Sequence, residues 1–374
     1  MNSQSVDPSE ERDPVRTSLP RTEEHVRNQR IEQVVPLLTP ALMLHQLPLS
    51  EDQAAVVVGG RERIAAVLDG TDDRLFAVVG PCSVHDVEAA IEYAGLLAAK
   101  AAELEEDLCI AMRVYFEKPR TTIGWKGMIN DPHLDDSGDV NRGLAMARGL
   151  LLDVLSMGLP VGCEWLDPIM PQYISDAVSW GAIGARTTES QIHRQLASGL
   201  SMPVGFKNRT DGNVDVAVDA VRAATAQHVF PGIDETGTPA ILHTHGNSDC
   251  HVILRGGKGA PNHTGEGLEA ALGKLRAAGL PERVVVDASH DNSGKDHLRQ
   301  PAVGSEIAAQ VAGGREEIVG VMLESFLVAG RQDLVAGAPL AYGQSITDAC
   351  MSWDVTVGVL DELAAAVRAR RAAR

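Results

Sequence analysis

The sequence predicts an α/β fold, a (β/α)8 TIM barrel with an N-terminal extension, and two observations support this prediction. First, eight short runs of apolar and β-branched residues recur along the chain. They lie at 75–82, 109–118, 159–166, 182–187, 203–208, 250–257, 283–290 and 318–325. Second, the intervals contain apolar residues three or four positions apart, the spacing of amphipathic helices. Strands that alternate with helices in this way are typical of such a barrel.

Each part of the chain has an expected place in this fold. Residues 1–30 are rich in Ser, Pro, Glu and Arg, a composition typical of a disordered tail. Residues 31–70 combine apolar runs, prolines and a helical pattern over 51–69, so we expect an ordered extension with a role in oligomerisation or regulation. Residues 71–374 then form the catalytic barrel. Its expected helices include 86–107, 141–158, 213–226 and a final helix whose RARRAAR cations suit the negative end of the helix dipole.

Composition narrows the possible functions. The 374 residues are 44% hydrophobic but only 3% aromatic, so the core must consist mainly of Ala, Val, Leu and Ile. The formal net charge is −18 and the pI is near 5.1, which argues against nucleic acid as the partner. The five cysteines form no CxxC pair, as expected in a reducing compartment. No segment resembles a signal peptide or an 18-residue apolar span, so we expect a cytoplasmic protein without membrane contact.

Reactive or charged residues stand at the ends of nearly all the expected strands. They are Cys82, Arg113 with Lys118, Glu164, Arg186, Lys207, Arg255, His290 and Glu324. The carboxyl ends of the strands in a (β/α)8 barrel all face one mouth, where catalytic groups are found. The topology therefore predicts that these side chains converge.

The cations among these residues predict an anion site. The stretch RVYFEKPRTTIGWKG at 113–127 gathers several cations in a protein of negative net charge. The expected cations of the mouth are Arg113, Lys118, Arg120, Arg186, Lys207 and Arg255. Gathered without partners, they would repel one another and incur a large desolvation cost. A ligand with several negative charges, such as a phosphorylated carboxylic acid, would relieve this cost, and guanidinium groups bind phosphate and carboxylate bidentately.

A second set of residues predicts a metal site. Cys82, His290 and Glu324 stand at the ends of strands one, seven and eight, which neighbour one another when a barrel closes, and Asp348 follows the last strand. One thiolate, one imidazole and two carboxylates suit a divalent ion such as Mn²⁺, Fe²⁺, Co²⁺ or Zn²⁺. The residues do not choose among these ions.

Other motifs offer weaker alternatives. The segment HTHGNSDCH, which contains His243, His245, Cys250 and His251, is dense in metal-binding residues, but its spacing matches no common zinc pattern. A loop before the sixth strand is the favoured interpretation. Phosphate-binding, dinucleotide-binding, nucleophile-elbow and HExxH motifs are missing from the sequence.

Four segments together resemble a known family. They are RVYFEKPRTTIGWKGMINDPHLDDS, GAIGARTTESQIHRQLASGLSMPVGFKNRTDG, CHVILRGG and YGQSITDAC. They are similar to type I 3-deoxy-D-arabino-heptulosonate 7-phosphate (DAHP) synthases, and the resemblance runs from about residue 31 to 370. It implies a metal-dependent transferase that condenses phosphoenolpyruvate with erythrose 4-phosphate at the entry to the shikimate pathway. It also implies a homodimer or homotetramer.

The resemblance assigns roles to particular residues. It implies one divalent metal ion on Cys82, His290, Glu324 and Asp348. It implies phosphoenolpyruvate against Arg113, Lys118, Glu164, Gly184, Ala185, Arg186, Lys207 and Arg255. It implies the phosphate of erythrose 4-phosphate near Lys118, Pro119, Arg120 and Thr121. Lys118 would then donate a proton to the developing alkoxide, and a water bound either by the metal or by Glu164 would add at C2. Arg186, Lys207 and Arg255 would hold the charges of the substrate and stabilise the departing phosphate.

The family resemblance also implies an aromatic amino acid effector. The expected pocket lies outside the mouth and uses 167–173, 197–201 and 227–237, with Gln172 and Ser201 as candidate lining residues. The segment HVFPGIDETGT departs from the usual run there, with Gly232 where a polar residue is common. The sequence therefore does not determine which amino acid is the effector, or whether there is one.

Three other functions stay open at this point. An octulosonate 8-phosphate synthase would use arabinose 5-phosphate, although EKPRTT argues against it. An aldolase could form an imine on Lys207 and would need no metal. A non-catalytic metabolite sensor would keep the fold, but it would be expected to have lost a metal ligand or a cation, and none is lost.

Overall fold

A computed structural model describes residues 26–120, 122–335 and 337–374. Residues Leu38–Arg374 form one compact unit, and residues up to Leu37 are assigned to a separate one. The two helices of the expected extension 31–70, α2 (Pro40–Gln46) and α3 (Glu51–Asp69), belong to the unit that contains the barrel. The role of this extension in oligomerisation or regulation stays a prediction. Most of the tail predicted over 1–30 lies outside the described residues.

Eight parallel strands close the barrel. They are β1 (Leu75–Gly80), β2 (Leu108–Arg113), β3 (Val161–Glu164), β4 (Trp180–Ile183), β5 (Val204–Lys207), β8 (His251–Leu254), β9 (Val284–Asp287) and β10 (Ile318–Glu324). The order around the barrel is β1-β10-β9-β8-β5-β4-β3-β2, so the first and last of these strands are neighbours. Each strand matches one of the eight predicted runs, and the predicted fold is confirmed. The predicted run 109–118 is too long, since β2 ends at Arg113.

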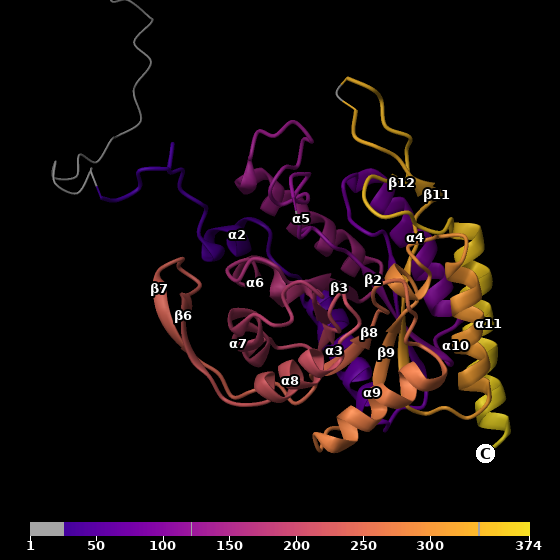
Figure 1. The fold of residues 1–374 in the computed structure, drawn as a ribbon. Helices are drawn as coiled ribbons and strands as arrows, with labels where there is room; N and C mark the ends of the chain where they lie inside the picture. The colour runs from indigo at the N-terminus through magenta and orange to yellow at the C-terminus, as the bar shows by residue number, and fades with distance from the viewer. Residues whose placement is uncertain (1–25, 121, 336) are drawn as a thin grey trace, which may run out of the picture. The chain divides into compact units, whose positions relative to one another are not determined.

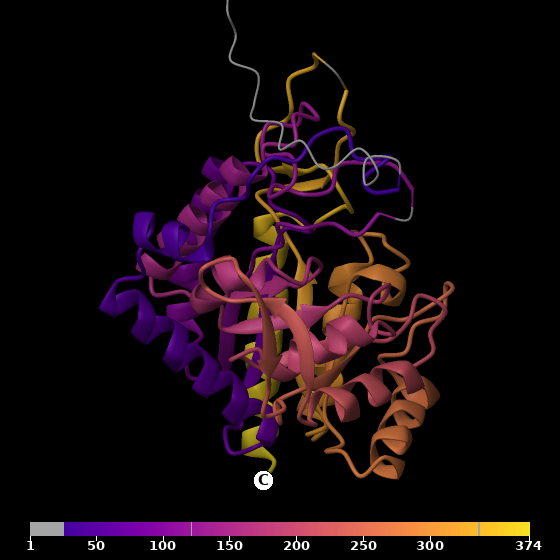
Figure 2. The ribbon, with the colours of Figure 1, turned by 90° about the vertical axis from the view of Figure 1, so that its left-hand side faces the viewer.

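Two strand pairs outside the barrel are absent from the sequence prediction. β6 (Val229–Ile233) and β7 (Pro239–His243) form an antiparallel hairpin, and β11 (Val328–Arg331) pairs with β12 (Gln344–Ser345). In Figure 1 the hairpin lies at the outer edge of the barrel, and in Figure 2 it runs across the front. Its residues are partly or fully exposed, so the hairpin lacks the continuously buried apolar run of a barrel strand.

Helices surround the barrel, and the helices that precede β3 begin with side-chain caps. α3 begins with a capping box between Ser50 and Gln53, and its observed span is the predicted 51–69. The remaining α-helices are α4 (Val87–Glu103), α5 (Val140–Ser156), α6 (Pro171–Ile174), α7 (Gln191–Gly199), α8 (Asp215–Ala224), α9 (Gly265–Ala277), α10 (Gln300–Ala312) and α11 (Trp353–Ala372). Short 3-10 turns follow α6 (η1, Ser175–Ala177) and β9 (η2, His290–Asn292). None of the helices in the described part of the chain combines the length and apolar character needed to span a membrane.

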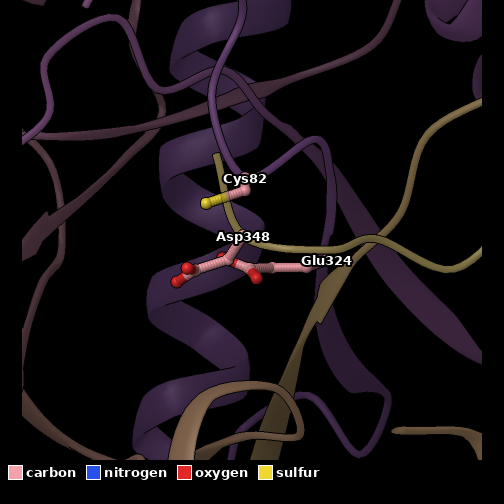
Figure 3. A group of neighbouring side chains, drawn as sticks. All are labelled: Cys82, Glu324 and Asp348. Atoms are coloured by element: carbon pink, nitrogen blue, oxygen red, sulfur yellow. The ribbon is translucent and has the colours of Figure 1, made fainter. Parts of the chain in front are cut away.

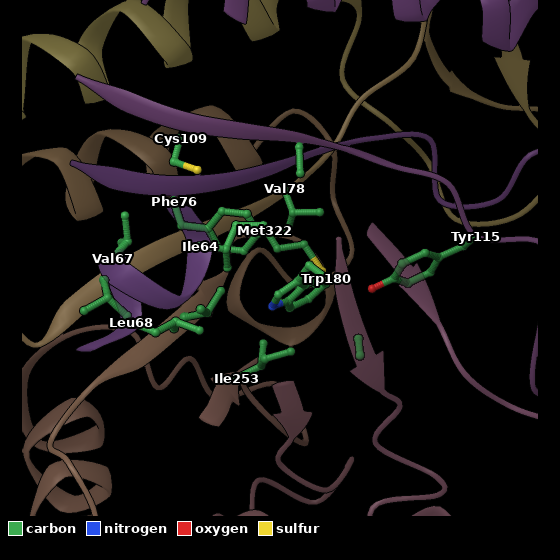
Figure 4. Close-up of a cluster of buried hydrophobic side chains, with 14 residues drawn as sticks. Ile64, Val67, Leu68, Phe76, Val78, Cys109, Tyr115, Trp180, Ile253 and Met322 are labelled. Carbon is green, nitrogen blue, oxygen red and sulfur yellow. The ribbon is translucent and has the colours of Figure 1, made fainter. Parts of the chain in front are cut away.

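The core joins the barrel interior to α3. Phe76 and Trp180 pack with ring centroids 5.6 Å apart, and Met322 and Ile253 belong to the same buried cluster (Figure 4). Ile64 from α3 is also part of this cluster. The helix of the predicted extension therefore contributes to the apolar core that supports the barrel.

The C-terminal arginines bind the chain segments that precede the barrel strands. Arg371 pairs with Asp73 at 2.6 Å and with Asp107 at 2.9 Å, and Arg374 pairs with Asp73 at 3.5 Å. Asp73 precedes β1 and Asp107 precedes β2. The RARRAAR cations therefore form a network of ion pairs with the barrel, in addition to the helix-dipole interaction expected from the sequence.

Replacing Arg371 with alanine is expected to lower Tm by about 1–3 °C at low salt, because these partly exposed pairs are screened by solvent. The loss should shrink at high salt. Thermal unfolding at two ionic strengths measures it, with Arg276→Ala, which removes an exposed pair with Glu282, as the control. A loss of Tm that is the same at both salt concentrations would contradict an electrostatic origin.

Candidate active site

Charged residues end five of the eight barrel strands. They are Arg113 on β2, Glu164 on β3, Lys207 on β5, Asp287 on β9 and Glu324 on β10. Parallel strands with these carboxyl-terminal residues bring the side chains to one end of the barrel. Four of the five were predicted from the sequence, and Asp287 was not.

A cavity of about 150 Å³ lies at this end of the barrel. Its lining includes all six predicted cations, Arg113, Lys118, Arg120, Arg186, Lys207 and Arg255. Pro119, Glu164, Gly184, Ala185, His290 and Asp348 line it too, together with Thr210, Lys295 and Thr347. Thr121 lies outside the described residues. The structure therefore brings the predicted cations together at one mouth, with more positive than negative side chains facing the cavity.

Arg113 is fixed in the floor of this cavity. Its side chain is 1% exposed, and its guanidinium donates to Pro81 O, Cys82 O and Glu324 Oε1, the last at 2.9 Å. The ring of Tyr115 lies under the guanidinium, with 3.7 Å between Cζ and the ring centroid. These contacts hold Arg113 in one orientation, which favours precise binding of an anion.

Lys207 lies between two buried carboxylates. Its Nζ is 3.5 Å from Glu164 Oε2 and 3.5 Å from Asp287 Oδ2. Burial would raise the pKa of Glu164, but Lys207 and the other cations of the mouth outweigh it, so the pKa lies below its ordinary value. Gly184 leaves room for this carboxylate, since a Cβ at that position would lie 2.8 Å from Glu164 Oε1. An imine-forming lysine must be a neutral amine, so the two ion pairs of Lys207 favour binding and charge stabilisation over the imine alternative.

Replacing Glu164 with glutamine is expected to lower the free energy of unfolding by about 1–3 kcal/mol near neutral pH, because Lys207 loses one of its buried partners. A carboxylate with a lowered folded pKa contributes stability above its unfolded pKa, about 4.5, and loses it as pH falls through the folded value. The difference between wild type and variant should therefore shrink in acid. Urea unfolding at neutral and acidic pH measures it, with the exposed Glu189→Gln as the control. A pH-independent difference would contradict this account.

A candidate metal-binding group lies at the junction of β1 and β10. Strand pairing places Gly80 opposite Glu324, so the chain delivers Cys82 beside Glu324 two residues later. Asp348 reaches the same place because Met351 N donates to Glu324 O and Ser345 Oγ donates to Asp348 O. One donor atom from each of Cys82, Glu324 and Asp348 lies within 4.8 Å of the others (Figure 3). The three ligands predicted from distant parts of the chain are thus gathered.

The environment of these donors is strongly polar. Burial raises the pKa of the Cys82 thiol, and Glu324 adds to this effect, while Lys118 Nζ lies 3.1 Å from Cys82 Sγ and opposes it. Burial would raise the pKa of Asp348, but Lys295 and the nearby cations lower it to about 2. One sulfur and two carboxylate donors fit a borderline divalent ion. Thiolate coordination would release a proton.

His290 is close to this group but does not belong to it. It lines the same cavity, and its Nδ1 lies 2.8 Å from Asp287 Oδ2 and 2.9 Å from Ser289 Oγ. Its φ of 49° is a left-handed conformation that is rare outside glycine. Asp287 therefore orients the imidazole through Nδ1 and leaves Nε2 available to face the cavity. The role of His290 as a fourth ligand stays a prediction.

The competing cluster at 243–251 does not form a metal group among the described residues. His243 ends β7 and is exposed, whereas His251 begins β8 and is buried. His251 Nε2 accepts a hydrogen bond from Trp180 Nε1 at 3.2 Å. Burial lowers the pKa of His251 to about 4, so this residue acts as a neutral part of the barrel core.

Comparisons with known proteins agree with this geometry. The model of the DAHP synthetase I family matches residues 46–361. The chain belongs to the DAHP synthetase I family. It is 55% identical over 353 residues to the phospho-2-dehydro-3-deoxyheptonate aldolase of Corynebacterium glutamicum, covering 92% of this chain and 96% of that one. It is 54% identical over 342 residues to the Phe-sensitive enzyme of Escherichia coli, covering 91% and 97%.

A solved structure extends the family comparison to three dimensions. The phospho-2-dehydro-3-deoxyheptonate aldolase of Francisella tularensis superposes with a TM-score of 0.89 at 50% sequence identity. The match covers 91% of this chain and 99% of that one. The barrel and its mouth therefore have the DAHP synthetase I fold.

Two of the expected regulatory segments, 197–201 and 227–237, lie close to each other outside the mouth. Gln172 is half-buried in α6, and Ser201 is exposed just after α7. Ser198 Oγ lies 2.7 Å from Thr244 Oγ1, which places 197–201 against the base of the β6–β7 hairpin. At the other end of the hairpin, Glu235 O accepts a hydrogen bond from Ala41 N at the start of α2. The part of Gln172 and Ser201 in effector binding stays a prediction.

Sequence reasoning missed several residues of the mouth. Asp287 ends the run VVVD and resembles an ordinary strand terminus, and Tyr115 resembles a core aromatic residue. Lys207, one partner of Asp287, lies far away in sequence, whereas His290 is close to Asp287 and Arg113 is close to Tyr115. Asp287 lies inside the predicted run 283–290, and its closeness to His290, which was already assigned to the mouth, was the available signal.

Proposed function

We propose that this protein is a 3-deoxy-7-phosphoheptulonate synthase, a transferase that condenses phosphoenolpyruvate with erythrose 4-phosphate and water to give DAHP and phosphate. Membership of the DAHP synthetase I family supports the reaction. The observation that carries the proposal is the single barrel mouth that holds seven cations beside a thiol and two carboxylates. Two phosphorylated substrates need such cations, and an aldol-type condensation needs an electrophile-activating group beside them.

Phosphoenolpyruvate would bind over the floor of the cavity. Arg113, Lys207 and Arg255 are nearly buried cations in fixed positions, the last through a 2.6 Å ion pair with Asp291. Buried cations of this kind bind carboxylate and phosphate strongly because little water competes. Gly184, Ala185 and Arg186 line the adjoining wall.

Erythrose 4-phosphate would bind nearer the opening. Lys118, Pro119 and Arg120 lie on one loop after β2, and exposure increases from half-buried Lys118 to exposed Arg120. Arg120 can therefore meet the phosphate end of a substrate whose aldehyde points toward Cys82.

One divalent ion would be held by Cys82, Glu324, Asp348 and His290, whose donor chemistry fits Mn²⁺, Fe²⁺, Co²⁺ or Zn²⁺. When bound, such an ion supplies a Lewis acid for the aldehyde oxygen.

The protein's own residues would orient and protonate the substrates. Lys118 Nζ donates to Cys82 O at 3.0 Å, so this ammonium group lies where the aldehyde oxygen would gain negative charge and can donate a proton to it. Glu164 and Lys207 lie on the other side of the cavity, where a carboxylate can orient the water that adds to C2 of phosphoenolpyruvate. Arg113 and Arg186 would stabilise the phosphate as it leaves.

An aromatic amino acid effector is a further part of this proposal. It is supported by the name of the Phe-sensitive E. coli relative and by the contacts that join 197–201, the β6–β7 hairpin and α2. Gln172 and Ser201 remain the candidate lining residues. Assembly as a homodimer or homotetramer in the cytoplasm also stays a prediction.

The decisive experiment follows the loss of phosphoenolpyruvate absorbance. Chelator-treated protein is mixed with erythrose 4-phosphate or with arabinose 5-phosphate, each with and without Mn²⁺. Consumption only with the four-carbon sugar and metal supports the proposal. Consumption with the five-carbon sugar would move the protein to the octulosonate synthases, and none with either sugar would favour a metabolite sensor. Added Phe, Tyr and Trp then test the effector.

A further inference from the structure

Glu117 carries a buried carboxylate that the proposed mechanism does not use. It lies between β2 and Lys118, and its residue exposure is 5%. Its Oε1 accepts a hydrogen bond from Asp167 N at 3.1 Å, and its Oε2 accepts a longer one from Leu166 N at 3.4 Å. A carboxylate buried at this depth is costly unless its position is needed.

On one side, Glu117 begins the loop that carries the expected erythrose 4-phosphate contacts. Lys118 N donates to Lys126 O at 2.8 Å, and Arg120 Nε donates to Trp125 O at 2.8 Å. These two bonds join the first part of the 118–126 loop to its last part. They do not by themselves fix the orientation of the loop relative to the barrel. Gly127 allows the return, since a Cβ there would lie 2.0 Å from Phe116 O.

On the other side, Glu117 binds the segment after β3, which other elements hold in place. Trp165 N donates to Ala182 O on β4 at 2.9 Å, directly before the two amides that bind Glu117. Leu166 O lies 2.8 Å from His193 Nε2 on α7. Burial lowers the pKa of His193, so the neutral ring donates from Nε2 and its Nδ1 accepts from Ser190 Oγ. The segment after β3 is thus held by β4 and α7.

We propose that Glu117 is a positioning residue that fixes the 118–126 loop, and with it Lys118 and Arg120, to the segment after β3. This inference rests on the proposed function, because it assigns the loop to the aldehyde substrate. Glu117 touches no reacting atom. The Glu117 carboxylate sets the distance between the cations of the loop and Glu164 at the end of β3. Loss of this carboxylate should therefore weaken erythrose 4-phosphate binding more than phosphoenolpyruvate binding.

The ionisation of Glu117 should change the strength of the hydrogen bonds that its carboxylate accepts from Leu166 N and Asp167 N. Burial raises its pKa to about 8, and the neighbouring carboxylates of Asp167 and Glu164 add to the shift, while the two amides oppose it. Cys163, also close by, has a raised pKa from burial and is a neutral thiol. The ionised carboxylate accepts from both amides, whereas the protonated group has one acceptor oxygen fewer. The link should therefore be tighter above about pH 8 than below it.

The test compares Glu117→Ala, Glu117→Gln and the wild type, each as metal-loaded full chain. Glu117→Ala leaves both amides without their partner, and we expect KM for erythrose 4-phosphate to rise about 10-fold. The dissociation constant for phosphoenolpyruvate, measured by equilibrium dialysis, should change by less than about two-fold, since most of its contacts come from other strands. Glu117→Gln should show a smaller rise, and the ratio of its KM to that of the wild type should increase above about pH 8.

Glu306→Ala is the matched control, because its carboxylate binds the buried His263 at 2.7 Å on another part of the molecule. It should leave both substrate constants unchanged. An active wild type with an unchanged KM in Glu117→Ala would overturn the inference alone. If that variant fails to fold, a Glu117→Gln KM equal to that of the wild type on both sides of pH 8 would overturn it equally. A wild type that does not consume erythrose 4-phosphate would instead overturn the proposed function.

Discussion

Replacing Cys82 with alanine is expected to lower metal-dependent turnover at least about 1000-fold. The Cys82 sulfur is one of three donor atoms that lie within 4.8 Å of one another, and alanine cannot replace it. Lewis-acid activation contributes several kcal/mol to such reactions, and each 1.4 kcal/mol corresponds to about ten-fold in rate. The measurement is kcat/KM after chelator treatment and addition of Mn²⁺, together with the amount of metal retained after dialysis.

Cys250→Ala is the control for this variant. Cys250 is also a buried free cysteine, but it precedes β8 at the opposite end of the barrel strands. It should retain metal and most of the activity. Near-normal turnover of Cys82→Ala would refute the assignment of Cys82 as a ligand, and full metal retention without turnover would assign Cys82 to a different role.

Replacing Lys207 with methionine is expected to lower kcat/KM by about 100- to 1000-fold. Methionine fills a similar volume but leaves Glu164 and Asp287 without the cation that lies 3.5 Å from each of them. Removing one partner of a buried pair costs about 3–5 kcal/mol, and part of this loss should appear as weaker phosphoenolpyruvate binding. The pKa of Glu164 should rise, so activity should require a higher pH than in the wild type.

A pH–rate profile and the dissociation constant for phosphoenolpyruvate measure these effects. Lys274→Met is the matched control, because Lys274 forms a half-exposed ion pair with Asp215 on the outer helices. An unchanged phosphoenolpyruvate constant in Lys207→Met would contradict the assigned role of Lys207. Trapping of the wild type by borohydride in the presence of substrate would instead revive the imine mechanism.

The sequence predicted the barrel because each of its strands has a local signature. The run LFAVVG, for example, is apolar throughout, and the structure buries every residue of β1. The cations of the mouth were also predictable, since Arg113 and Lys207 each follow such a run directly. A local pattern and a known topology were sufficient for both.

The features of the fold and of the site that the sequence did not predict depend on contacts between distant residues. Nothing near Glu117 in sequence indicates that its carboxylate would meet the amides of Leu166 and Asp167. The β6–β7 hairpin has exposed residues on both strands, so its pattern resembles a loop. Arg371 resembles any cation at a helix end until the positions of Asp73 and Asp107 are known.

The candidate metal-binding group has a consequence for folding. Cys82 comes from the first barrel strand, Glu324 from the last, and Asp348 from the segment that follows it. An ion bound by all three would cross-link the chain where β1 pairs with β10 and the barrel closes. It would join parts of the polypeptide that are separated by nearly the whole barrel sequence. Ligand binding to the native state alone raises stability with ligand concentration. Pairing of β1 with β10 and metal affinity should therefore be coupled. We expect the calorimetric Tm to rise with Mn²⁺ in the wild type and not in Cys82→Ala.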